Sequence, residues 1–218
     1  MTNYELIKSE CSKYHAKLIV VTKLQDPESI LKLYNQGHRY FAENKAQALT
    51  QKKDLLPKDI EWHMIGHLQK NKVKSIIPFI ANIQSVDSYE LALEINKQAQ
   101  KISRIIPILL QIKISSDESK YGFEINGLMD SLKTDPWHLL ENIEIKGVMG
   151  IGSLVTDRQI TRKEFRQLKN NLDKINRMTN YKLSLTEISM GMSGDYQIAL
   201  EEGSTMIRVG TLVFADLT

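Results

Sequence analysis

The sequence has little of several features on which whole classes of protein depend. Its 218 residues include a single cysteine, Cys11, so an intramolecular disulfide is excluded. No window approaches the roughly 20 apolar residues that a membrane-spanning helix needs. The N-terminal stretch MTNYELIKSECSKYHAK also lacks the apolar segment of a signal peptide. We therefore expect a cytoplasmic protein with no membrane association.

A dominant charge of one sign is missing as well. The formal net charge is only +3, and basic and acidic residues are mixed along the chain. The densest basic run is KNKVK, at Lys70 to Lys74, and such a run is typical of a solvated helix face. Nucleic-acid binding would be expected to leave a concentrated basic face. We therefore expect no nucleic-acid partner.

Short apolar runs alternate with longer amphipathic ones along the whole chain. The run LIVVT, at 18–22, is apolar and β-branched, as expected of a strand buried on both faces. The segment after it has Asp26 and Pro27 as helix-start signals and Gly37 as a stop. The pattern recurs, and the longest expected helix covers 162–178. The expected strands are 18–22, 39–44, 60–66, 82–86, 104–114, 143–152, 183–191 and 205–210.

Eight strand-then-helix units without a Pro/Gly/Ser-rich linker favour one α/β domain with a parallel sheet. Eight is the number that a TIM-type (β/α)₈ barrel requires, and we expect such a barrel over residues 1–218. A doubly wound open sheet is the alternative, because it is built from the same units. The sequence shows no internal repeat and no low-complexity segment.

In a barrel, functional residues gather at the carboxyl ends of the strands. The residues found there are Lys23, Glu43, Asn44, His67, Ser85, Asp87, Gly150, Met190 to Ser193, Gly210 and Thr211. Lys23 closes a strand that is otherwise wholly apolar. An amine at the dry end of a buried strand is a candidate nucleophile toward a carbonyl group. The alternative is an exposed lysine that begins a loop.

The chain has only 11 glycines, yet four of them lie in EISMGMSGDYQIALEEGSTMIRVGT, at 187–211. GMSGD precedes an expected helix, and VGT follows the last expected strand. The loops after strands seven and eight are the usual phosphate site of a barrel. Glycine lets backbone N–H groups approach an anion, and Ser193 and Thr211 can add hydroxyl donors. The alternative is that these glycines only make tight turns.

A phosphate site combined with a nucleophilic lysine suggests a sugar-phosphate aldolase or a protein that carries pyridoxal 5′-phosphate (PLP). Arg208 precedes Gly210 by two residues, so it points into the barrel if both lie on the inner strand face. The alternative role of Arg208 is a salt bridge in the barrel wall.

Two other signals are weaker. His63 and His67 in HMIGH resemble half of a zinc site, but the segment reads as a strand and lacks the HExxH glutamate. We therefore expect no metal. Glu201 and Glu202 precede Gly203 at the end of an expected helix, where they read as a solvated face.

The motifs VVTK, FAEN, EWHMIGHLQKNK, SVDS, ESKYGF, KGVMGI, SMGMSGD and GSTMIRVGT occur in this order. Together they resemble the PLP homeostasis protein family, also called the alanine-racemase N-terminal-like family. The resemblance runs from about Leu18 to Phe214 and implies a single TIM-type barrel. The sequence departs from the family at Ala42 and Ala215, where glycine is usual. Tyr121 stands where the family has a small residue.

The resemblance also implies which residues contact PLP. They are Lys23, Asn44, Ser193, Arg208, Gly210 and Thr211. Lys23 would carry the cofactor as a Schiff base, Asn44 would lie near the ring, and Arg208 would face the pyridine nitrogen. The remaining three would hold the phosphate. Because arginine only donates, the nitrogen facing it should stay unprotonated, which makes the ring a poorer electron sink.

Such a ring suits racemase-like chemistry or no chemistry. Alanine racemases that share this barrel add a β-rich domain with a facing tyrosine, whereas this chain stops at Thr218, shortly after the eighth expected strand. We expect a non-enzymatic protein, without catalytic residues, that holds PLP and hands it to PLP-dependent apo-enzymes. We expect a monomer or a weak dimer. The alternatives are a weakly active amino-acid racemase and a Schiff-base aldolase acting on a phosphorylated sugar.

Overall fold

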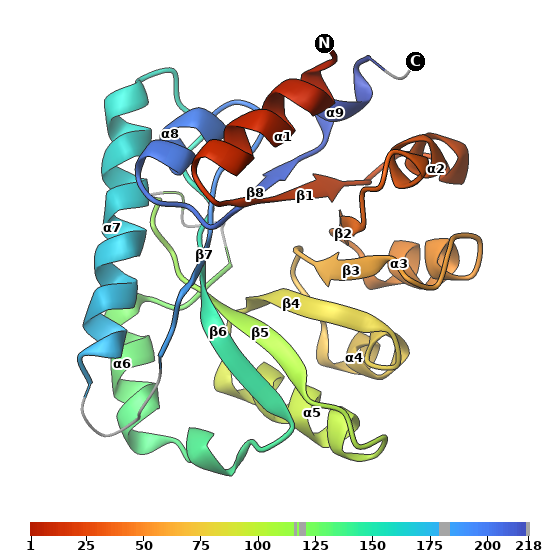
Figure 1. The fold of residues 1–218 in the computed structure, drawn as a ribbon. Helices are drawn as coiled ribbons and strands as arrows, with labels where there is room; N and C mark the ends of the chain where they lie inside the picture. Colours follow the sequence, from red (N-terminus) through yellow and green to blue (C-terminus); the bar gives the residue numbers. More distant parts are fainter. Residues whose placement is uncertain (116, 118–120, 179–183, 217–218) are drawn as a thin grey trace.

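Eight parallel strands close into a barrel, with the helices on its outside (Figure 1). The computed structural model describes residues 1–115, 117, 121–178 and 184–216. Each strand pairs with the next along the chain, and the last pairs back with the first. The strands are β1 (Lys17–Val21), β2 (Tyr40–Glu43), β3 (Glu61–Met64), β4 (Ile80–Val86), β5 (Ile106–Gln111), β6 (Ile143–Met149), β7 (Glu187–Ser189) and β8 (Met206–Val209). The prediction of a TIM-type barrel is confirmed, and the open-sheet alternative is wrong.

The helices alternate with the strands as the pattern predicts. They are α1 (Asn3–Lys13), α2 (Pro27–Asn35), α3 (Ala46–Lys53), α4 (Lys70–Ile76), α5 (Tyr89–Gln100), α6 (Ile125–Thr134), the 3₁₀ helix η1 (Trp137–Leu139), α7 (Arg158–Asn176), α8 (Tyr196–Glu201) and α9 (Thr211–Phe214). No helix in these described ranges combines the length and apolar character needed to cross a membrane. The lysines of the KNKVK run are exposed on α4, as predicted.

Helices α1 and α9 lie next to each other at one side of the barrel (Figure 1), and the sequence pattern places neither of them. A capping box starts α1: the Thr2 side chain accepts from the backbone of Glu5, whose carboxylate accepts from the Thr2 N–H. The Asn3 amide donates to Asp216 at 3.0 Å, just after α9. These contacts hold the segment that follows β8, where Gly210 and Thr211 lie.

The core has two parts because side chains alternate between the faces of each strand. On β1, Leu18 and Val20 face the helices and join the main apolar cluster. Ile19 belongs to a separate small cluster with Ala42 and Met206. This small cluster comes from β1, β2 and β8, and it forms an apolar part of the barrel interior.

Seven of the eight strands end one to three residues before the expected boundary, and only β4 ends at the expected residue, Val86. The strand expected at 104–114 is Ile106–Gln111, and the strand expected at 143–152 is Ile143–Met149. The strand expected at 183–191 is Glu187–Ser189, and residue 183 lies outside the described part of the chain. After β6 the chain leaves the sheet because the Ser153 N–H and hydroxyl both donate to Glu164 on α7. Periodicity in sequence gives no sign of such a contact between a loop and a helix.

Candidate functional site

Lys23 lies in a tight turn directly after β1. The N–H of Gln25 donates to the Thr22 carbonyl at 3.0 Å, and Leu24 has a φ of +64°. A positive φ at the third position is typical of a type II turn, which puts Lys23 at the second position. Lys23 is exposed in this turn. Lys23 therefore begins an exposed loop and does not lie at a dry strand end, and its role as a nucleophile stays a prediction.

A buried ion pair anchors this turn. Thr22 donates its hydroxyl to Glu43 Oε1 at 2.7 Å, and Lys52 Nζ donates to the same oxygen at 2.6 Å. Lys52 Nζ also reaches the Thr22 carbonyl oxygen, at 2.6 Å. Only 1% of the Glu43 surface is exposed. These contacts fix the start of the Lys23 turn to β2 and α3.

One hollow of about 310 Å³ brings together Lys23, Gly210 and Thr211, which are three of the six predicted site residues. It lies between the ends of β1 and β8, and its lining residues are Val21, Lys23, Leu24, Gln25, Gly210, Thr211, Phe214 and Ala215. A Cβ on Gly210 would lie 2.7 Å from the Val21 carbonyl oxygen, so glycine allows this close approach. The volume is at the lower end of the roughly 300–1,000 Å³ of small-molecule sites.

Arg208 is a buried cation inside the barrel. Only 3% of its surface is exposed, and it donates to Ser189 Oγ at 2.7 Å and to the Gly150 carbonyl at 3.0 Å. Burial lowers the pKa of Arg208 to about 10, while the charge of Asp195 acts in the opposite direction. Arg208 is therefore protonated at neutral pH. The inward orientation predicted for Arg208 is confirmed, and the two acceptors that hold it are neutral oxygens.

Behind Arg208, further polar side chains cross the barrel interior. Ser189 on β7 donates to Gln84 Oε1 on β4 at 2.6 Å, and Gln84 Nε2 lies 2.9 Å from His63 Nδ1 on β3. Since β4 and β7 are not neighbours in the sheet, the contact between them passes through the interior. Neither Ser189 nor Gln84 is among the residues that the sequence predicts for the site. The available signal was a polar residue at an inward position of each strand.

His63 and His67 do not act as a pair. His63 is 4% exposed in the barrel interior, and burial lowers its pKa to about 3. His67 is exposed, and its Nδ1 lies 2.9 Å from Asp87. The Tyr121 ring stacks on His67 with centroids 3.8 Å apart. Tyr121, which stands where the family has a small residue, therefore packs on His67.

The GMSGD segment forms a tight loop before α8. Gly191 has a φ of +93°, and a Cβ there would lie 2.5 Å from Ala199 Cβ, so both conformation and packing require glycine. The Asp195 carboxylate closes the loop by accepting from the Met192 N–H at 2.5 Å. Burial is the main cause that raises the pKa of Asp195. Ser193 is half-buried in this loop and is not among the residues that line the Lys23 hollow.

Asn44 directly follows β2 and is exposed. It does not line the Lys23 hollow. Its backbone packs against Gly66, where a Cβ would lie only 2.2 Å from the Asn44 carbonyl oxygen. The structure thus places Asn44 at the carboxyl ends of the strands, and its role near a cofactor ring stays a prediction.

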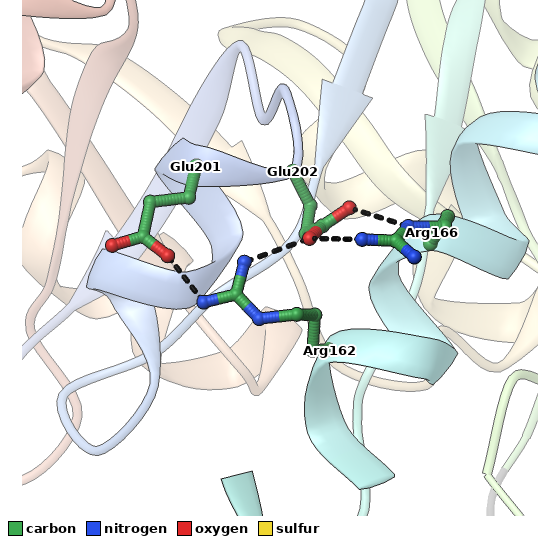
Figure 2. Close-up of polar contacts among 4 residues, drawn as sticks. All are labelled: Arg162, Arg166, Glu201 and Glu202. Carbon is green, nitrogen blue, oxygen red and sulfur yellow. Dashed lines mark hydrogen bonds and ion pairs between the residues drawn. The ribbon is translucent and has the colours of Figure 1, made fainter. Parts of the chain in front are cut away.

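An ion network joins α7 to the end of α8 (Figure 2). Arg162 pairs with Glu201 and, at 2.8 Å, with Glu202. Arg166 donates to both carboxylate oxygens of Glu202, at 3.0 and 3.1 Å. The interpretation of these glutamates as a solvated face is wrong for Glu202, which is only 9% exposed and has two arginine partners, whereas Glu201 is exposed. The network fixes α8, and with it the loop that carries Ser193, to α7.

We expect Glu202→Gln to lower the free energy of unfolding by about 1 kcal/mol, since a carboxylate shared by two arginines is lost. Hydrogen bonds from Arg166, ahead of those from Arg162, lower the pKa of Glu202. The stabilisation should therefore be present above the pKa of the unfolded state and be lost as pH falls through the lower folded value. Urea unfolding at pH 7 and at low pH measures both effects. The matched control is Glu201→Gln, which removes a more exposed carboxylate; an equal loss in both variants would contradict this account.

Comparison with known proteins identifies the family of this chain. Residues 1–217 match the family described as alanine racemase, N-terminal domain. The chain is 40% identical over 207 residues to the pyridoxal phosphate homeostasis protein of Synechocystis sp., covering 92% of this chain and 91% of the relative. This chain belongs to the pyridoxal phosphate homeostasis protein family. A second member, from Aquifex aeolicus, is 36% identical over 204 residues, covering 92% of this chain and 87% of that protein.

Solved structures place this member of the pyridoxal phosphate homeostasis protein family beside PipY of Synechococcus elongatus. The PipY structure without PLP superimposes with a TM-score of 0.89 at 33% identity, covering 98% of this chain and 100% of PipY. The PipY structure with PLP bound gives a TM-score of 0.86 at 32% identity, with the same coverage. Alanine racemase of Clostridium difficile shares the fold alone, with a TM-score of 0.68 at 15% identity; this chain covers 56% of it.

Proposed function

We propose that this protein binds PLP at the carboxyl ends of the barrel strands and takes part in intracellular PLP homeostasis. The observation that carries the proposal is the hollow that Lys23, Gly210 and Thr211 line together. Family membership supports it, because the relatives are named pyridoxal phosphate homeostasis proteins and PipY has a structure with PLP bound. Residues 1–218 would form one PLP-binding domain.

The residues of the hollow fit the cofactor. PLP supplies an aldehyde, which forms a Schiff base with a lysine amine. Lys23 offers an exposed amine, held in place by a turn that is anchored through Thr22. Thr211 offers a hydroxyl donor beside the glycine of the last strand end, and Ser193 offers another at the neighbouring strand end. Hydroxyl and backbone donors of this kind suit a phosphate group.

Arg208 fits the pyridine nitrogen. Each terminal nitrogen of an arginine carries two hydrogens, and the bonds to Ser189 and Gly150 use one on each. The remaining donors are available to a lone pair, and the guanidinium has no proton acceptor to offer. A ring nitrogen held by such a donor stays unprotonated and withdraws electrons weakly. This chemistry favours a protein that holds and releases PLP over one that turns over amino acids.

The finer proposal is a cytoplasmic, non-enzymatic protein that passes PLP to PLP-dependent apo-enzymes. A weakly active amino-acid racemase and a Schiff-base aldolase on a sugar phosphate are the rival functions. Purified protein mixed with PLP should turn yellow and lose this absorption on borohydride reduction. Racemisation of free amino acids at enzyme-like rates would favour the first rival. A colourless protein that binds sugar phosphates would favour the second.

If Ser193 and Thr211 hold one phosphate, Ser193→Ala and Thr211→Ala should each weaken PLP binding. The expected loss is about 1–3 kcal/mol, typical of a hydrogen bond to a charged group. The double variant should deviate from additivity, because both hydroxyls would serve the same anion. Absorbance titration with PLP measures each affinity.

Pyridoxal, which lacks the phosphate, serves as the control ligand for these variants. It should bind the wild type weakly and respond little to either substitution. Equal losses for pyridoxal and PLP would contradict the shared phosphate site, since general damage to the fold affects both ligands alike.

A further inference from the structure

We propose that Ser189, Gln84 and His63 are positioning residues for Arg208, joined to it by a hydrogen-bond chain that has only one possible direction. The four side chains come from β8, β7, β4 and β3, so the chain spans the barrel interior. The exposed fraction is 0% for Ser189 and Gln84, 3% for Arg208 and 4% for His63. The inference rests on the proposed function only where it assigns Arg208 to the pyridine nitrogen.

The direction of the chain starts from Arg208, because a guanidinium can only donate. Ser189 Oγ accepts from Arg208 Nη1 at 2.7 Å, so the hydroxyl proton of Ser189 is free to point at Gln84, 2.6 Å away. The distance of 2.6 Å is within the range of an O–H···O bond and shorter than a usual N–H···O bond, so the group facing Ser189 is an acceptor. The carbonyl oxygen of the Gln84 amide therefore faces Ser189, and the amide nitrogen faces the opposite wall.

At that wall the amide nitrogen of Gln84 can only donate, so the His63 nitrogen that it meets must accept. This nitrogen is Nδ1, at 2.9 Å. The neutral ring then carries its proton on Nε2. Burial keeps the pKa of His63 at about 3, which leaves the ring neutral at physiological pH. The same amide nitrogen lies 3.8 Å from Met206 Sδ, a weak acceptor, as this orientation requires.

The hydrogen-bond chain fixes the orientation of the Arg208 guanidinium. Because its proton is committed to Gln84, Ser189 can present only a lone pair to the guanidinium. Gly150 supplies the second acceptor, and the two together fix the plane of the group. Loss of the Gln84 carbonyl would free the Ser189 hydroxyl to rotate. A side chain on β4 thus controls the orientation of a cation on β8.

Side-chain ¹⁵N NMR of the protein without PLP tests the direction of this hydrogen-bond chain and its effect on Arg208. In the wild type at pH 7, His63 Nδ1 should be unprotonated and Nε2 protonated, and the two Arg208 Nη resonances should be resolved because rotation is restricted. Gln84→Glu replaces the amide with an isosteric carboxylate that accepts on both sides, so the His63 proton should move to Nδ1. Ser189→Ala should average the Arg208 Nη resonances.

The control is Ser204→Ala, which removes another buried hydroxyl that bonds only to backbone carbonyls of β7, β8 and Met190. Both resonance patterns should survive in it. Circular dichroism checks the fold of each variant, and Gln84→Met, which should give a mixture of His63 tautomers, replaces Gln84→Glu if the latter does not fold. A wild-type His63 protonated on Nδ1 would overturn the direction of the chain. Resolved Arg208 resonances in Ser189→Ala would overturn the positioning role.

A third measurement links the chain to the cofactor. The absorption maximum of bound PLP should shift in Ser189→Ala and stay unchanged in Ser204→Ala. An unchanged maximum in Ser189→Ala would overturn the effect of the chain on PLP. If the wild type binds no PLP, the proposed function fails, while the resonances of the protein alone still decide the positioning of Arg208.

Discussion

Lys23→Ala is expected to abolish covalent attachment of PLP while leaving the barrel folded. Lys23 supplies the amine of the hollow, and the ion pair that anchors its turn uses Thr22, Glu43 and Lys52 instead. Because Lys23 is exposed, its truncation opens no core cavity. The variant should therefore lose all borohydride-sensitive absorption but keep the circular dichroism and urea midpoint of the wild type.

The matched control for this experiment is Lys45→Ala. Lys45 is another exposed lysine at a strand end, directly after Asn44, and it does not line the hollow. It should keep the full PLP absorption. A folded Lys23→Ala protein that still shows this absorption would mean that a different lysine carries the cofactor.

Arg208→Glu is expected to change both the spectrum of bound PLP and the stability of the protein. An acidic side chain in this position allows the ring nitrogen to be protonated, which should shift the absorption of the cofactor. Two hydrogen bonds from a buried cation are also lost, and we expect a destabilisation of about 3–6 kcal/mol, since each such bond contributes roughly 1.5–3 kcal/mol. Absorbance spectra and urea unfolding measure the two effects.

Arg208→Lys separates charge from geometry in the same experiment. Lysine keeps the positive charge but cannot reproduce the planar donor arrangement that reaches Ser189 and Gly150 together. The ring nitrogen should stay unprotonated in this variant, with weaker PLP binding. A folded Arg208→Glu protein with an unchanged spectrum would mean that Arg208 only supports the barrel.

The barrel could be predicted because its strands are buried on both faces. Their apolar runs stand out against amphipathic helices, and the count of eight favours the closed sheet over the open one. The ends of the strands were less certain. The expected strand included residues 150–152, yet β6 ends at Met149, and Ser153 contacts Glu164 on α7 instead.

The candidate site, too, could be predicted only in part. Lys23, Gly210 and Thr211 could be placed together because β1 and β8 are neighbours in any closed barrel of this order. The two-residue alternation of side chains along a strand also predicted that Arg208 faces the barrel interior. It could not indicate that Ser189, Gln84 and His63 meet behind it, because alternation gives the face of a side chain and not its partner across the interior.

Contacts made by charged side chains of the helices were equally hidden. Lys52 reaches Glu43 from the last turn of α3, and Arg162 and Arg166 reach Glu202 from α7. Each pair depends on the rotation of a helix about its axis relative to its neighbour. The glutamates at the end of α8 therefore read as solvated until the packing of α7 is known.

The central claim is that Lys23 holds PLP, and peptide mapping tests it most directly. Wild-type protein would be incubated with PLP, reduced with borohydride, digested and analysed by mass spectrometry. The account predicts one phosphopyridoxyl group per chain, on the peptide that contains Lys23. Labelling of a different lysine, or labelling spread evenly over exposed lysines such as Lys45, would contradict it.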